Sequence, residues 1–198
     1  MKRCIHSLFL FSLLLMTGCA SSQMMQVPEG VAPYTASPDK STVVFMRPSA
    51  FGGAAQSYAV QYDNDTPEFI GIVSTNYKIA FQTSPGEHLF MIMGENTDYL
   101  KADLAANHIY YVIVEPHLGF MKSRFSLDPV TASQLDTQDF KDDLAECSFV
   151  QNTPESMKWF EENREKIMAR YRSSYKDWLA DPEDQSRLSK EDGRSLSE

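Results

Sequence analysis

Two apolar segments near the middle of the chain constrain the fold more than any other feature. Residues 88–93 carry apolar side chains on both faces of an extended strand, and residues 108–114 do the same. A strand with one wet face would alternate apolar and polar residues instead. The Pro85-Gly86 turn signal precedes the first segment. We therefore predict two central strands, each covered on both faces.

Other predicted strands flank this pair, as runs rich in β-branched and aromatic residues between turn signals. They cover residues 42–46, 58–62, 69–73, 77–82, a weaker run at 101–104, and 120–127. Gly71 interrupts the third of these runs and indicates a bulge. Residues 41–130 are therefore predicted to form an antiparallel β-sandwich, and the chain is mainly β.

The C-terminal part predicts helices that cover this sandwich. Residues 154–180 follow an Asn-Thr-Pro-Glu start signal and end before Asp-Pro. Their apolar side chains recur at helical spacing: Met157, Phe160, Ile167, Met168, Tyr171, Tyr175 and Trp178. A second, short helix is predicted at residues 136–147. Residues 131–180 are therefore predicted to be a helical extension packed on the sandwich. Residues 181–198 are predicted to be a frayed polar tail.

The N-terminus resembles a bacterial lipoprotein signal. Basic residues precede an apolar segment that is too short to span a bilayer and ends in Met16-Thr17-Gly18-Cys19. The resemblance implies that residues 1–18 are removed and that Cys19 is acylated. Ala20 follows, where an Asp would favour the inner membrane, so the outer membrane facing the periplasm is expected. An ordinary secretory signal is the alternative. Residues 19–40 are predicted to be a flexible tether.

Charge and cysteine content narrow the possible functions. The formal net charge of -9 gives no electrostatic basis for binding nucleic acid. After processing and acylation, Cys147 is the one remaining free cysteine, so an intrachain disulfide is excluded. Cys147 is read as a buried apolar residue, with a reactive thiol as the alternative.

Short motifs in the sandwich region are similar to those of a family of uncharacterised bacterial lipoprotein domains. They are Phe45-Met46-Arg47-Pro48, Gly52-Gly53, Tyr77, Pro85-Gly86-Glu87-His88 and Tyr110-Tyr111-Val112. The resemblance extends over residues 42–130. It implies an immunoglobulin-like sandwich in a lipid-anchored envelope protein, and it brings no catalytic residue. Asn107-His108 stands where the family usually has Gly-Lys.

The sequence carries none of the familiar catalytic signatures, such as G-x-S-x-G or H-E-x-x-H. No catalytic residue and no cofactor is therefore predicted, and we expect a protein that is not an enzyme. His88, His108 and His117 would form a zinc or copper site only if the strands brought them together. Hydrogen-bonded histidines are the alternative interpretation.

Two functions remain. The first is a non-enzymatic outer-membrane lipoprotein, held in the membrane by its lipid, that serves as an envelope binding or structural module for a protein or glycan partner. The second is a periplasmic small-ligand carrier or sensor, with an aromatic pocket between sandwich and helix lined by Tyr58, Tyr62 and Tyr77. An enclosed apolar cavity would favour the carrier, whereas a filled interface with an exposed apolar patch would favour the binding module.

Overall fold

The computed structural model describes residues 23–48, 55–63, 66–118, 123–182 and 185–196. The signal sequence, Cys19 and the Gly52-Gly53 loop lie outside these ranges. So do residues 64–65 of the expected turn and residues 120–122 of the last expected strand.

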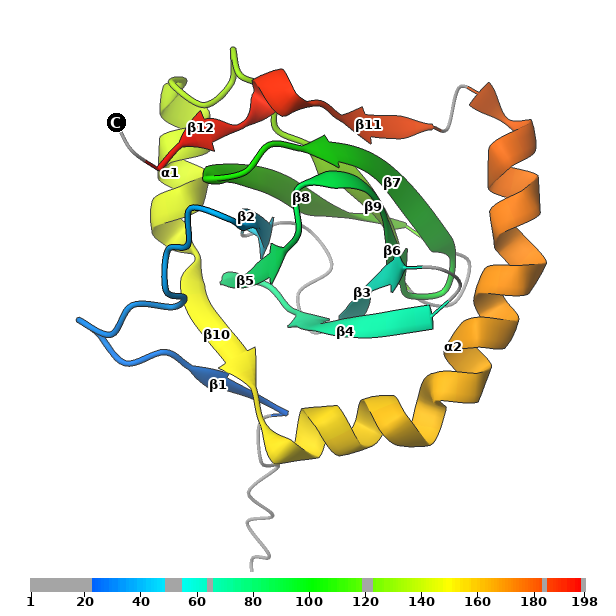
Figure 1. Ribbon diagram of the computed structural model, residues 1–198. Helices are drawn as coiled ribbons and strands as arrows, with labels where there is room; N and C mark the ends of the chain where they lie inside the picture. The colour runs from blue at the N-terminus through cyan, green and yellow to red at the C-terminus, as the bar shows by residue number, and fades with distance from the viewer. Residues whose placement is uncertain (1–22, 49–54, 64–65, 119–122, 183–184, 197–198) are drawn as a thin grey trace, which may run out of the picture.

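β-Strands are the largest part of the described chain, and one long helix follows most of them (Figure 1). The strands before the first helix are β1 Met24–Gln26, β2 Ser41–Arg47, β3 Ser57–Asp63, β4 Thr66–Val73, β5 Tyr77–Thr83, β6 Gly86–Met93, β7 Thr97–Leu104, β8 His108–Leu118 and β9 Ser123–Pro129. The later elements are α1 Gln138–Glu146, β10 Ser148–Asn152, α2 Pro154–Ala180, β11 Ser186–Leu188, the 3-10 helix η2 Lys190–Asp192 and β12 Arg194–Ser195.

The described strands form two sheets that pack face to face. One has the order β1-β10-β5-β2-β8-β12, with β9 also pairing with β8, and the other has the order β11-β7-β6-β3-β4. The core between them is apolar, and Phe45 of β2 meets Phe90 of β6 edge to face at 5.2 Å. The predicted β-sandwich is confirmed. Most strand pairs are antiparallel, but β2–β8, β10–β5 and β11–β7 are parallel.

The predicted central strands are central, and a different helix covers the outer side of each. Strand β6 lies between β3 and β7, and α2 covers the sheet to which it belongs. Strand β8 lies beside β2, and its outward Tyr111 packs against Phe140 of α1. Figure 1 shows α2 curving around two sides of the β-structure.

Helix α2 has the predicted bounds, 154–180, because its start signal is complete. Thr153 is the N-cap, and its hydroxyl accepts a hydrogen bond from the amide of Ser156, while the Ser156 hydroxyl accepts one from the amide of Thr153. Within the predicted apolar stripe, Phe160, Ile167 and Trp178 are buried. Met157 was wrongly placed in this stripe, since 41% of its surface is exposed.

The predicted flexible tether over 19–40 contains a paired strand, so it is wrong for residues 24–26. Strand β1 lies within it and pairs with β10, in the register Met24 to Asn152 and Gln26 to Val150. Met24 is buried. Gly71 of β4 makes this packing possible, because a Cβ there would lie 2.4 Å from Ile79 Cδ1 and 3.1 Å from Met24 Cε. The bulge expected at Gly71 is present, where the β3–β4 register shifts.

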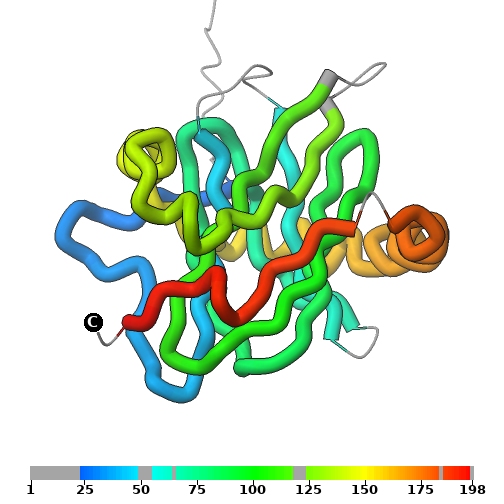
Figure 2. The backbone as a smooth tube through the Cα atoms, turned by 90° about the horizontal axis from the view of Figure 1, so that it is seen from above, coloured from blue at the N-terminus to red at the C-terminus, as the bar shows by residue number. Residues whose placement is uncertain are grey.

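The predicted frayed tail is wrong for residues 186–195. Strand β11 pairs with β7, strand β12 pairs with β8, and Leu188 is fully buried. Figure 2 shows this segment, in red, lying across the strands. Gly193 lies on the ring of Tyr110, where a Cβ would come within 2.5 Å of a ring carbon. The Tyr110 hydroxyl donates to the carbonyl oxygen of Lys190 at 3.3 Å.

Candidate functional site

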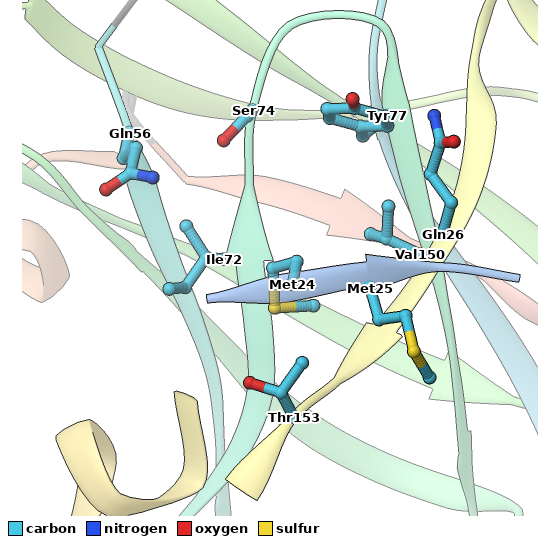
Figure 3. Close-up of a pocket in the computed structure, with 9 residues that line it drawn as sticks. All are labelled: Met24, Met25, Gln26, Gln56, Ile72, Ser74, Tyr77, Val150 and Thr153. Carbon is cyan, nitrogen blue, oxygen red and sulfur yellow. The ribbon is translucent and has the colours of Figure 1, made fainter. Parts of the chain in front are cut away.

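The best candidate site is a groove between the edges of the two sheets, beside β1. We call it the β1 groove. It has a volume of about 490 Å³ and is lined by Met24, Met25, Gln26, Gln56, Ile72, Ser74, Tyr77, Val150 and Thr153. Figure 3 shows Ser74 and Tyr77 toward one end and Thr153 toward the other, with Met24 between them. Strands β1, β4, β5 and β10 and the N-cap of α2 therefore contribute to one surface.

A chain of hydrogen bonds holds the walls of the groove in place. The Thr153 hydroxyl donates to the carbonyl oxygen of Gln23 at 2.8 Å. The side-chain amide of Asn152 donates to the carbonyl oxygen of Ile70 at 3.0 Å, and the Ser156 hydroxyl donates to the Asn152 side-chain oxygen at 3.0 Å. These bonds tie β1, β4 and the start of α2 to one another, so the groove is part of the folded framework.

The chemistry of the groove is that of a binding surface. Met25 provides exposed apolar surface above the nearly buried Met24, Ile72 and Val150, and the polar side chains that line the groove are amides and hydroxyls. None of the lining residues carries a charge at neutral pH. Methionine side chains adapt to ligands of irregular shape because they are flexible and polarisable. The groove can therefore accept a neutral apolar group and donate or accept hydrogen bonds at its margin.

The tyrosines expected to share a pocket do not lie together. Tyr58 stacks on Trp159 of α2 at 4.0 Å between ring centroids, and Tyr62 stacks on Tyr171 at 4.1 Å. These ring pairs occupy part of the space between sandwich and helix, and two separate hollows remain beside them, one of about 190 Å³ lined by Tyr58 and Trp159 and one of about 430 Å³ lined by Tyr62 and Tyr175. Tyr77 belongs to the other sheet and lines the β1 groove. Of the three candidates, Tyr77 alone lies at the candidate site.

The three histidines are also separate. His88 lies on β6 and is bonded to the carbonyl oxygen of Ser84 at 2.7 Å. His108 and His117 lie near opposite ends of β8, about 30 Å apart for an extended strand. They bond to the Ala106 carbonyl and the Ser126 hydroxyl. Within the described ranges, no group of three or more His, Cys, Asp or Glu side chains is arranged to hold a metal ion.

Two buried ionisable residues lie away from the groove lining. Cys147 is 3% exposed, and burial raises the pKa of its thiol to about 11, which agrees with the buried rather than the reactive interpretation. Arg47 is fully buried, and burial lowers its pKa. Its guanidinium donates to the Ala55 carbonyl and lies 5.0 Å from the ring centroid of Phe125, while Nε and Nη2 have no partner among the described residues. Both residues belong to the packing of the sandwich.

The groove residues of β1 were missed by reasoning from the sequence. Met24 and Met25 were assigned to the flexible tether because a run of three strand residues has no detectable periodicity. The available signal was a cluster of apolar residues, Met24, Met25 and Val27, within a polar segment.

Comparison with known proteins does not assign the chain to a family. No protein-family model matches it, and a search of curated proteins gave no match. The resemblance to lipoprotein domains therefore stays a prediction from its motifs. Within the described part of the chain, no helix combines the length and apolarity needed to cross a bilayer.

Proposed function

We propose that this protein is a non-enzymatic lipoprotein of the outer membrane, facing the periplasm, that acts as an envelope binding or structural module. The anchor is the acylated Cys19, as the resemblance of the N-terminus to a bacterial lipoprotein signal implies. The binding surface is the β1 groove, and its partner is an envelope protein or a glycan. The observation that carries this proposal is the composition of the groove, which combines apolar surface with uncharged hydrogen-bonding groups.

The separation of Tyr58 and Tyr62 supports a binding module over a carrier with one aromatic pocket beneath α2. Each ring is stacked on an aromatic ring of the helix, and the two tyrosines line separate hollows of about 190 and 430 Å³. The β1 groove is the other place that a carrier function could use. Its volume of about 490 Å³ falls within the range of small-molecule sites, which favours this second candidate enough to test it.

The anchor is tested by metabolic labelling with palmitate. The wild-type chain should incorporate label and fractionate with the outer membrane, because the thioether at Cys19 is what retains it. The Cys19→Ser variant should incorporate none and be released. Label in the variant, or its absence from the wild type, would contradict the proposal.

The binding surface is tested by a photo-crosslinking amino acid at Gln56, on the lining of the groove. Lys176, exposed on α2, is the control position. A module should give a discrete crosslinked protein or glycan from Gln56 and none from Lys176. A carrier should instead co-purify with a small molecule, detected by native mass spectrometry, that a variant at an exposed lining residue, Met25→Asp, lacks. Equal crosslinking from both positions would reject the groove as the binding surface.

A further inference from the structure

The described chain begins very close to the proposed anchor. Three residues lie between Cys19 and Gln23, the first described residue, so the two are four residue steps apart along the chain. A fully extended chain of four residues spans at most about 14 Å. The predicted tether of about 20 residues would have allowed several times that distance. If Cys19 is acylated, Gln23 therefore lies within about 14 Å of the lipid glycerol groups.

Gln23 is fixed to the body of the domain. Its carbonyl oxygen accepts a hydrogen bond from the hydroxyl of Thr153, and the next three residues pair with β10. Strand β10 in turn pairs with β5 inside the sheet. We call residues 23–26 and 153–157 the anchor face. A short link that ends on a fixed strand restricts which face of the domain can approach the membrane.

Exposed apolar side chains collect near this link. Among the described residues, the large apolar side chains with the greatest exposure are Met25 at 50%, Val31 at 55%, Met157 at 41% and Leu179 at 41%. Met25 and Met157 belong to the anchor face, and Val31 lies in the segment that follows β1. Leu179 lies at the far end of α2. A lipid surface at the attachment point would cover both methionines.

The charges around the anchor face do not form a basic patch. Glu155 is exposed in the first turn of α2, and Lys158 is paired with Glu162 at 3.7 Å. Attraction to anionic lipid would require clustered Lys or Arg residues. Contact with the membrane at this face would therefore depend on the anchor and on apolar insertion.

We infer that the anchor face lies on the lipid leaflet that holds the acyl chains of Cys19, with Met25 and Met157 in contact with lipid. This inference rests on the proposed lipidation. It places the end of the β1 groove lined by Met25 and Thr153 toward phospholipid and leaves the end lined by Ser74 and Tyr77 open to a partner. It also gives the domain a fixed orientation, in which the far end of α2 points away from the anchor.

The test uses lipidated protein in vesicles of phosphatidylethanolamine that contain brominated lipid as a quencher. A fluorescent thiol probe is placed by Met157→Cys or, as a matched control with the same exposed fraction on the same helix, by Leu179→Cys. Both variants carry Cys147→Ala. Fluorescence should be lost at position 157 and retained at position 179. Added phosphatidylglycerol should change neither result.

A third protein tests the role of the short link. A Gly-Ser insertion of about ten residues between Cys19 and Gln23 would reach roughly 15 Å further as a random coil, so quenching at position 157 should decline. Equal quenching at 157 and 179, or none at 157, overturns the inferred orientation. The mass of the N-terminal peptide reports separately whether Cys19 carries lipid. A chain without lipid contradicts the proposed function, whereas a lipidated chain with an unquenched position 157 contradicts the orientation alone.

Discussion

The outer faces of the two sheets are covered in different ways. Helix α2 covers its sheet with stacked rings, and Tyr99 of β7 contacts the rings of Tyr171, Tyr175 and Trp178. Helix α1 covers part of the other sheet with a small separate cluster of Met46, Val130, Leu135, Phe140 and Cys147. One sequence signal, a strand that is apolar on both faces, thus predicts that a cover exists but leaves its size open.

The largest expected effect comes from removing the α2 cover. A chain ending at Thr153 would expose Tyr58, Tyr62, Phe69 and Tyr99 together, a patch large enough to drive association. We expect aggregation, measured by light scattering and size-exclusion chromatography. A soluble monomer that unfolds cooperatively would show that the sandwich does not depend on α2.

Single tyrosines compare the two covers directly. Tyr99 is fully buried among three rings, whereas Tyr111 is half-buried against one, Phe140. Tyr99→Ala should cost about 4 kcal/mol of unfolding free energy, and Tyr111→Ala about 2 kcal/mol. Urea unfolding measures both values. The reverse order would mean that the α1 cluster, and not the α2 layer, dominates stability.

The stability of the fold at alkaline pH depends on one buried ionisable group under each helix, Tyr99 under α2 and Cys147 under α1. Burial raises the pKa of Tyr99 from 10.0 to about 12, and that of Cys147 from 9.0 to about 11. Both groups hold their protons more tightly in the folded state. Their contributions are therefore complete below pH 9 and are lost as pH rises through the folded pKa values. Each loss should reach about 3 kcal/mol.

Stability measured from pH 8 to pH 12 checks this prediction. Cys147→Ala should remove the part of the decline between about pH 9 and 11, and Tyr99→Phe the part between about pH 10 and 12. Profiles that match the wild type would mean that neither group stays protonated in the folded state.

The helix N-caps give the smallest difference. Thr153 of α2 takes part in a reciprocal capping box and donates to the distant Gln23 carbonyl. Thr137 of α1 accepts a bond from the Phe140 amide at 3.3 Å and donates to the nearby Gln134 carbonyl at 2.7 Å. Thr153→Ala should cost about 1–2 kcal/mol and Thr137→Ala about 0.5–1 kcal/mol. The Ser variant at each position retains the hydroxyl and is the control. Equal costs would mean that the long-range bond to Gln23 adds no more stability than the local bond to Gln134.

Features with strong local signals could be predicted from the sequence. The bounds of α2 follow from an N-cap, a proline and an aromatic stripe, and the central strands follow from their length and apolar pattern. Leu188 could not be assigned to the core, because a single apolar residue in a polar tail has no period. Its burial depends on pairing with β7, more than 80 residues earlier in the chain.

The candidate site was harder to predict because it is assembled from distant segments. Met24, Ile72 and Val150 approach one another only after β1 pairs with β10 and Gly71 lets Met24 pack closely. No local sequence pattern predicts that these three residues come together. The histidines and tyrosines were chosen for their chemistry, and the topology distributed them over two sheets.

The last strands have a consequence for the order in which the chain folds. Strand β11 closes the β7 edge of one sheet, and β12 closes part of the β8 edge of the other. Open strand edges invite pairing with other chains. Both edges stay open until residues 186–195 are available, so partly synthesised chains are the species most prone to aggregation. Completion of the two sheets must also wait for contacts between residues that are far apart in the sequence.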